Sequence, residues 1–168
     1  MKKFAFYAVT FCAIILSVCK MNAQNAPKEG DMFVDFTVLQ EPSNPDSKVS
    51  LSDYVGKGKW VIADFWASWC GPCRNEIPYI REAYNKLPKD KVTVLSIAVS
   101  DKLADTQKAA KELKIEWEQI VNTESVAVKA YGIRGIPHII LFAPDGKIAK
   151  VGLRGTNIYT YTKEAISK

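Results

Sequence analysis

The sequence places two cysteines, Cys70 and Cys73, two residues apart in the stretch ADFWASWCGPCRNEIPYI, after an apolar run and before a segment with helical patterning. Such a pair could be half of a zinc site, a structural disulfide, or a dithiol that exchanges electrons with other thiols. The residues outside the pair decide among these three kinds of chemistry.

Residues 1–23 have the pattern of a secretory signal peptide. Lysines come first, an apolar run over residues 4–18 follows, and small and polar residues end it. The run is short for a membrane-spanning helix. We expect cleavage after Ala23, which leaves residues 24–168 as one exported, periplasmic domain. A lipid attached to Cys19, or an uncleaved N-terminal helix that anchors the protein in the membrane, is the alternative.

The mature chain then holds few ligands for a metal. It retains the two cysteines of the pair and a single histidine, His138, far along the chain, whereas a tetrahedral zinc site needs four ligands. A disulfide that closes so short a loop removes little entropy from the unfolded chain, so a purely structural role is also a poor explanation. Redox exchange is the chemistry that remains, and it suits a compartment in which disulfides persist.

Composition and charge limit the classes of partner. The chain has 168 residues, 48% of them hydrophobic, which is enough for one domain with its own core. Its 23 basic residues outnumber 18 acidic ones, but three of the lysines lie in the signal peptide, so the mature domain is nearly neutral. Because no basic run with interleaved aromatic residues remains, we expect no nucleic-acid partner.

The pattern around the pair predicts the elements that would position it. The apolar run over residues 60–66 predicts a strand buried on both faces, and a helix is expected over residues 70–87. A second strand and a second helix follow within residues 92–114, so the sheet should be largely parallel at its centre. Residues 136–153 predict a hairpin around a Pro-Asp-Gly turn, and residues 156–167 predict a closing helix.

The start of a helix is a favourable position for a reactive thiol. Unpaired N–H groups and the positive end of the helix dipole stabilise the thiolate of Cys70. Lowering its pKa from about 8.5 to about 7 would leave about half of it ionised at neutral pH. Cys73, one turn inward, would be shielded and would resolve the mixed disulfide. Gly71 allows a tight turn, and Pro72 suits the first helical turn because it has no N–H to satisfy.

The segments DFWASWCGPC and YGIRGIPHIILFAPDGK resemble the thioredoxin superfamily over most of the mature chain. The signal peptide, the opening GDMFVDFTVLQ and an extra helical segment before EWEQIV are similar to the TlpA/ResA branch of extracytoplasmic thiol-disulfide oxidoreductases. The resemblance implies an α/β thioredoxin fold: a central mixed β-sheet flanked by helices, with an N-terminal extension and an inserted helical segment. The opening also resembles peroxiredoxins, but those need a lone cysteine and no mature cysteine stands outside the pair.

The resemblance implies further site residues. Pro137 would be held in cis opposite the cysteine pair, which leaves the backbone of Ile136 free to pair with an extended client segment. Asp64 would be a buried acid with a raised pKa, suited to accept the proton of Cys73, unless it lies at a wet strand end. Glu76, three residues past Cys73, is the second candidate acid, unless it is simply a solvated helix residue.

Other residues near the pair are given simpler roles. Trp69 is expected to be an exposed apolar platform beside the disulfide, and Trp66 is expected in the core. Pro78 should kink the helix. His138 either faces the site or points away from it, because side chains alternate along a strand. The residues expected to contact substrate are Trp69, Gly71, Pro72, Ile136 and Pro137.

Together these features predict a periplasmic dithiol-disulfide oxidoreductase with no metal or other cofactor beyond the Cys70–Cys73 disulfide. The family implies that it reduces oxidised client proteins of the envelope, such as apocytochrome c in cytochrome c biogenesis, with electrons from a membrane thiol reductase. A Cys-Gly-Pro-Cys sequence fits a potential of around −270 mV better than that of a strong oxidant. The alternatives are a disulfide oxidant or isomerase, or a non-catalytic module that holds a client or Cu(I).

Overall fold

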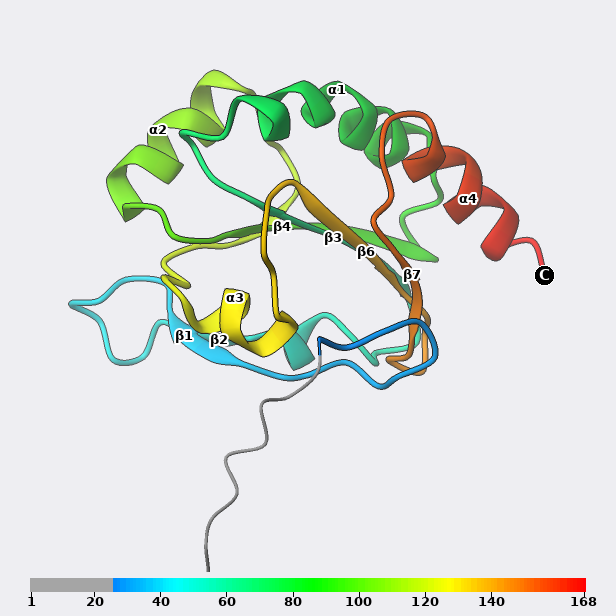
Figure 1. Ribbon diagram of the computed structural model, residues 1–168, viewed down its shortest axis with the longest axis horizontal. Coiled ribbons are helices and arrows are strands. Elements are labelled where there is room, and N and C mark those ends of the chain that lie inside the picture. Colours follow the sequence, from blue (N-terminus) through cyan, green and yellow to red (C-terminus); the bar gives the residue numbers. More distant parts are fainter. Residues whose placement is uncertain (1–25) are drawn as a thin grey trace, which may run out of the picture.

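The computed structural model describes residues 26–168, so the predicted signal peptide, with Cys19, lies outside the described residues. A five-stranded sheet in the order β5-β4-β3-β6-β7 forms the centre, and a two-stranded sheet, β1-β2, lies apart from it. Helices α1, α2 and α4 cover one face of the large sheet, while α3 and the small sheet cover the other (Figure 1). The strands are β1 Thr37–Leu39, β2 Lys48–Ser50, β3 Trp60–Trp66, β4 Val92–Ala98, β5 Glu118–Ile120, β6 His138–Phe142 and β7 Ile148–Val151. The helices are η1 Leu51–Asp53, α1 Gly71–Lys86, α2 Leu103–Glu112, α3 Val126–Tyr131 and α4 Asn157–Ala165.

The large sheet is mixed, as the resemblance to the thioredoxin superfamily implies. Strand β3 pairs parallel with β4 but antiparallel with β6. The expectation of a largely parallel centre is therefore wrong on one side of β3. The reason is the connection through α3. It joins the end of β5 to the start of β6 at the same edge of the sheet, so β6 runs in the opposite direction to β3, β4 and β5. This connection brings the segment before β6 next to the end of β3.

Strand β3 explains how both faces of the sheet are filled. All seven of its residues are apolar except Asp64, and the strand is almost wholly buried, as a central strand covered on both faces must be. Phe65 packs in the core beneath α3, whereas Ile62 packs against Ile77 and Ile80 of α1. Because side chains alternate along a strand, Asp64 lies on the same face as Ile62, under α1.

The predicted elements agree closely with the observed ones. The strand predicted over residues 60–66 is β3, and the helix predicted over residues 70–87 is α1, one residue shorter at each end. The N-terminal extension carries β1 and β2, and the inserted helical segment is α2. No helix within residues 26–168 combines the length and the apolar character needed to cross a bilayer.

Candidate active site

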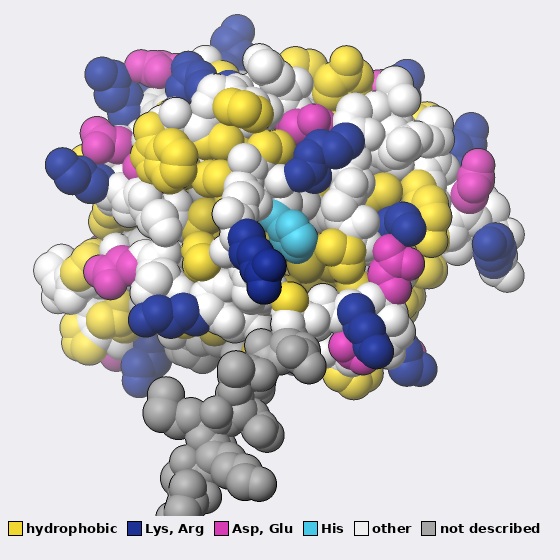
Figure 2. Space-filling model, viewed as in Figure 1, with side chains coloured by type: hydrophobic (Ala, Val, Ile, Leu, Met, Phe, Trp, Pro, Cys, Tyr) yellow, Lys and Arg dark blue, Asp and Glu magenta, His cyan; other side chains and the backbone are white. Residues whose placement is uncertain are grey.

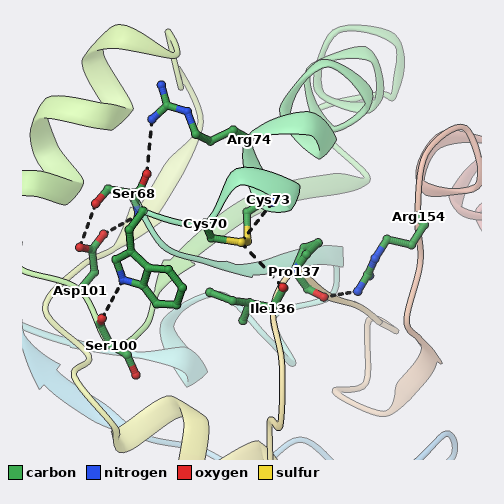
Figure 3. Close-up of a disulfide and its surroundings, with 10 residues drawn as sticks. Ser68, Cys70, Cys73, Arg74, Ser100, Asp101, Ile136, Pro137 and Arg154 are labelled. Atoms are coloured by element: carbon green, nitrogen blue, oxygen red, sulfur yellow. Dashed lines mark hydrogen bonds between the residues drawn. A yellow bond between two sulfur atoms is a disulfide. The ribbon is translucent and has the colours of Figure 1, made fainter.

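Cys70 and Cys73 form a disulfide at the junction of β3 and α1 (Figure 3). Their sulfurs are 2.01 Å apart and their Cα atoms 5.3 Å apart. Cys70 caps α1, and its sulfur accepts the backbone N–H of Cys73 at 3.2 Å. Gly71 and Pro72 form the start of the helix and are exposed to solvent. The predicted position of the pair at a helix start is confirmed.

Solvent exposure does not separate the two cysteines. Cys73 is 1% exposed, which agrees with the predicted shielding, but Cys70 is only 4% exposed. What distinguishes them is the helix terminus, because only the sulfur of Cys70 accepts an N–H from the first turn. That bond and the helix dipole would favour a thiolate on Cys70 once the disulfide is reduced. The division into attacking and resolving thiols stays a prediction.

The segment before β6 lies directly against the disulfide. The Ile136–Pro137 peptide bond is cis, as the resemblance to the superfamily implies. The carbonyl oxygen of Ile136 is 3.7 Å from the sulfur of Cys70 (Figure 3). Within residues 26–168 the N–H of Ile136 has no backbone partner. An extended client segment could therefore pair with the backbone of Ile136 without displacing a bond of the protein.

Asp64 is a wholly buried acid beneath the site. It is 0% exposed, and neither carboxylate oxygen has a hydrogen-bond partner in the described chain. Burial raises the pKa of this carboxyl from 3.8 to about 8; the positive charge of Arg154 lowers it in part, and the negative charge of Glu76 raises it. The predicted burial of Asp64 is confirmed, and the alternative of a wet strand end is wrong. A carboxyl that ionises near neutral pH can act as a base there.

Glu76 is not a purely solvated helix residue. It is half-buried on α1, and its Oε2 accepts the backbone N–H of Gly155 at 2.8 Å. It therefore ties α1 to the loop that precedes α4. Its effect on Asp64 is electrostatic, since its charge raises the pKa of that carboxyl.

Arg154, in the same loop, escaped prediction from the sequence. Its Nη2 donates to the carbonyl oxygen of Pro137 (Figure 3). Its Nη1 donates to the carbonyl oxygen of Leu153 at 2.6 Å. The guanidinium thus lies beside the Ile136–Pro137 segment that precedes β6, called here the proline loop. A single arginine in a loop carries no spacing or periodicity, so the segment GLRGT contains no signal that could have identified it.

Trp69 forms an apolar surface next to the disulfide. It is 64% exposed, as predicted, and its indole Nε1 donates to the carbonyl oxygen of Ser100 at 3.1 Å, which fixes the orientation of the ring. A hollow of about 160 Å³ separates it from the proline loop. This hollow is lined mainly by apolar side chains and backbone, including Trp69, Val99, Ile133, Gly135 and Ile136.

The loop that leads to Cys70 is held by Asp101, which sequence analysis also missed. The carboxylate of Asp101 accepts the backbone N–H of Ser68 at 2.6 Å and the Ser68 hydroxyl at 2.9 Å (Figure 3). It also accepts the hydroxyl of Thr106 on α2 at 2.9 Å. One side chain therefore joins the loop before the disulfide to the start of α2. An acid three residues after a buried strand was the available signal.

His138 points away from the buried acid. Its ring packs 6.0 Å from that of Phe65, which belongs to the opposite face of β3 from Asp64. Burial lowers the pKa of His138, and the charge of Arg154 lowers it further. Figure 2 shows the protein's one histidine reaching the surface next to basic side chains. His138 therefore lies on the face of the sheet opposite the buried acid. Trp66 is fully buried, as expected.

A family model described as the AhpC/TSA family matches residues 30–151. The chain is similar to thiol-disulfide oxidoreductase ResA of Geobacillus thermodenitrificans (strain NG80-2), with 32% identity over 118 residues, 70% of this chain and 64% of that protein. It is 29% identical to ResA of Bacillus subtilis (strain 168) over 104 residues, 62% of this chain and 57% of that protein. The matches thus span less than two thirds of these relatives.

Solved structures show the same fold. The thioredoxin domain of a thiol-disulfide oxidoreductase from Bacteroides vulgatus superposes with a TM-score of 0.71 at 32% identity, covering 83% of this chain and 98% of that one. A thiol:disulfide interchange protein from Bacteroides sp. gives a TM-score of 0.72 at 31% identity, covering 84% of this chain and 92% of that one. The observed sheet and helices are therefore those of a thioredoxin fold.

Proposed function

This chain belongs to the AhpC/TSA family, and from that premise we propose that it is a protein dithiol-disulfide oxidoreductase that acts as a reductase outside the cytoplasm. The observation that carries the proposal is the Cys70–Cys73 disulfide at the N-terminus of α1, with the Ile136–Pro137 segment against it. The names of similar proteins, thiol-disulfide oxidoreductase and thiol:disulfide interchange protein, support the same activity.

The reaction needs only the two cysteines to carry electrons. The thiolate of Cys70 attacks one sulfur of a client disulfide, so that a Cys70–client bond forms while the client's own bond breaks and its other sulfur leaves as a thiolate. Cys73 then gives its proton to a base and attacks the sulfur of Cys70, which breaks the mixed disulfide. The client gains two electrons, and the protein is left with the Cys70–Cys73 disulfide.

Asp64 is the group best suited to take the proton of Cys73. The carboxyl lies under α1, whose first turn carries Cys73, and water is a poor acceptor in so enclosed a site. Because its pKa is about 8, the carboxyl is partly ionised at neutral pH and holds a proton firmly enough to keep it through the step. Glu76 would act on this base through its charge.

The surface around the disulfide suits an extended client. Trp69 offers an apolar face, the N–H of Ile136, which has no backbone partner within residues 26–168, can pair with a client backbone, and Gly71 and Pro72 beside the pair are exposed to solvent. We infer that the clients are oxidised envelope proteins, with apocytochrome c as one example, and that a membrane thiol reductase returns electrons to the pair. The signal-peptide pattern of residues 1–23 supports this location.

The reducing direction rests on the Cys-Gly-Pro-Cys sequence, which is shared with thioredoxin, whose potential is about −270 mV. Equilibrating the protein with defined thiol-disulfide buffers would measure the potential of the Cys70–Cys73 couple. A value close to that of thioredoxin is expected. A value near the −120 mV typical of a strong oxidant would contradict the reductase role and favour the second candidate, a disulfide oxidant or isomerase.

Trapping of mixed disulfides tests which cysteine attacks the client and which one resolves the mixed disulfide. Cys73→Ser should accumulate mixed disulfides between Cys70 and client proteins, because the resolving thiol is gone. Cys70→Ser should trap almost none, because in the described chain the sulfur of Cys73 does not accept the first-turn N–H that favours a thiolate on Cys70. Non-reducing electrophoresis of the two variants makes the comparison. Equal trapping by both would contradict the assignment of Cys70 as the attacking thiol.

A further inference from the structure

The loop between β7 and α4 contacts both elements that enclose the cysteine pair. Arg154 donates to the carbonyl oxygen of Pro137 on one side (Figure 3). The next residue, Gly155, donates its N–H to Glu76 on α1 at 2.8 Å. Two consecutive residues therefore hold the proline loop and the helix that carries Cys73. Gly155 has φ +53°, a left-handed conformation that favours glycine at this turn.

The same loop places a positive charge near the buried carboxyl. Asp64 has no hydrogen bond of its own in the described chain, so its ionised form depends on nearby charges. Two charges act on it: Arg154, from the loop before α4, favours the carboxylate, and Glu76, from α1, disfavours it. His138 lies toward the opposite face of the sheet, and its neutral form is favoured by burial and by the same guanidinium.

We propose that Arg154 is a positioning residue for the dithiol reaction, whose guanidinium fixes the Pro137 loop against the disulfide and supplies the positive charge that keeps the Asp64 carboxylate available as a base. The inference rests on the proposed function. It adds a residue that affects the reaction through Pro137 and Asp64. Arg154 contacts Pro137 and acts electrostatically on Asp64, and it is not in contact with either cysteine.

The chemistry of the guanidinium suits both tasks. Its two terminal nitrogens donate to carbonyl oxygens of two different segments, those of Pro137 and Leu153, which a single ammonium group cannot do in the same planar geometry. The group also stays charged at every pH at which the protein is folded. Arg154 is solvent-exposed as a residue, so water screens part of its charge and substitutions there are not expected to disrupt the core.

The two tasks can be separated by substitution. Arg154→Gln removes the charge but keeps an amide that can donate to Pro137. Arg154→Lys keeps the charge but cannot donate to the carbonyl oxygens of Pro137 and Leu153 in the same planar geometry. Lys150→Met is the matched control, because it removes one positive charge from β7 that is instead paired with Glu29 at 2.9 Å.

The first readout is the titration of Asp64 in the oxidised protein, followed by carboxyl ¹³C NMR without any client. Arg154→Gln should raise the pKa of Asp64, so that at pH 7 the ionised fraction falls about 3- to 10-fold. Arg154→Lys and Lys150→Met should leave it near the parent value. In the parent, the side-chain N–H signals of Arg154 should shift with the same midpoint as the carboxyl, which tests the coupling even if a variant fails to fold.

The second readout is the pH profile of mixed-disulfide resolution in rapid mixing. Arg154→Gln should move its midpoint to higher pH and slow resolution at pH 7 by the same 3- to 10-fold, whereas Arg154→Lys should keep the midpoint and instead raise the KM for client. An Asp64 pKa that is the same in the parent and in Arg154→Gln would overturn the inference. If the parent protein does not exchange disulfides with any client, the proposed function is contradicted. The effect of Arg154 on the pKa of Asp64 would still be measured by the titration.

Discussion

Replacing Asp64 by Asn should stabilise the protein at neutral pH, by an amount that grows with pH. The carboxyl is wholly buried without a hydrogen bond in the described chain, and burial raises its pKa from 3.8 to about 8. Below about pH 4 both the native and the unfolded chain hold the proton. Between these two pKa values the unfolded chain has released a proton that the native protein still holds, so the parent loses stability as pH rises. Above about pH 8 the loss levels off.

The size of the effect follows from the two pKa values. Each pH unit in this window costs the parent about 1.4 kcal/mol of unfolding free energy. At pH 7, about three units above the ordinary value of 3.8, the cost is on the order of 4 kcal/mol. Asn has nearly the same shape and no charge at any pH. The unfolding free energy of the variant should therefore lack this pH-dependent loss. Its difference from that of the parent should grow by about 4 kcal/mol between about pH 4 and pH 7.

Urea denaturation of the oxidised proteins, in steps from about pH 4 to pH 9, would measure this difference. Asp145→Asn is the matched control, because hydrogen bonds from Lys147 lower the pKa of that exposed acid. The ionised carboxylate of Asp145 stabilises the native protein above its ordinary pKa of 3.8, and this contribution is lost only below that value. Asp145→Asn should therefore lower stability by a constant amount over the measured range, whereas Asp64→Asn should raise it by an amount that grows with pH. A difference between the parent and Asp64→Asn that stays constant across the whole range would refute the argument for a buried acid with a raised pKa.

The same variant tests the catalytic role of the carboxyl. Asp64→Asn should slow resolution of the mixed disulfide by roughly 10²- to 10⁴-fold, the usual range for loss of a general base. It should also abolish the rise of the resolution rate toward pH 8, while the initial attack by Cys70 changes less. Rapid mixing that follows tryptophan fluorescence separates the two steps. Unchanged resolution from about pH 6 to pH 9 would exclude Asp64 as the base.

Three further outcomes are expected. Glu76→Gln removes a negative charge that acts on the buried acid and weakens the bond to the N–H of Gly155, so the midpoint of the resolution profile should fall to lower pH; a loss of resolution larger than that of the Asp64 variant would transfer the role of base to Glu76. Trp69→Ala removes the exposed apolar face beside the disulfide, so the rate of client attack should fall about tenfold or more while the potential of the couple stays near the parent value, as measured by trapping rates and redox equilibration. Mass spectrometry of the protein from its native host should find an N-terminus at or near Gln24 without a lipid, and a lipid-modified cysteine there would contradict the cleavage prediction.

Much of the site could be predicted because its residues are close together in the chain. The two-residue spacing of Cys70 and Cys73, the buried strand before them and the helix after them are all local patterns, and each has a direct physical meaning. Asp64 was singled out by the resemblance to the superfamily, and its apolar strand left only two alternatives, a buried acid or a wet strand end. The cis state of Pro137 needed the resemblance to the superfamily, since most X-Pro bonds are trans.

The direction of β6 and the orientation of His138 were decided by the tertiary structure. Apolar patterning shows that a segment is a buried strand, but it does not show from which edge of the sheet the chain enters. Only the short connection through α3 made β6 antiparallel to β3 and placed its first residues beside the disulfide. The face on which His138 lies followed from that pairing register, in which it stands opposite Phe65.

The sequence by itself determined the redox chemistry and the elements that carry the cysteines, because a helix cap, a buried strand and a thiol pair are encoded within one continuous stretch. The partners that set the proton chemistry were decided only by packing: Arg154 reaches Pro137 across 17 residues, and Gly155 reaches Glu76 across 79. Single polar residues in loops have no periodicity to reveal them. Their effect depends on distance in space and on the burial of Asp64, and both arise only when the sheet and its helices close around that carboxyl.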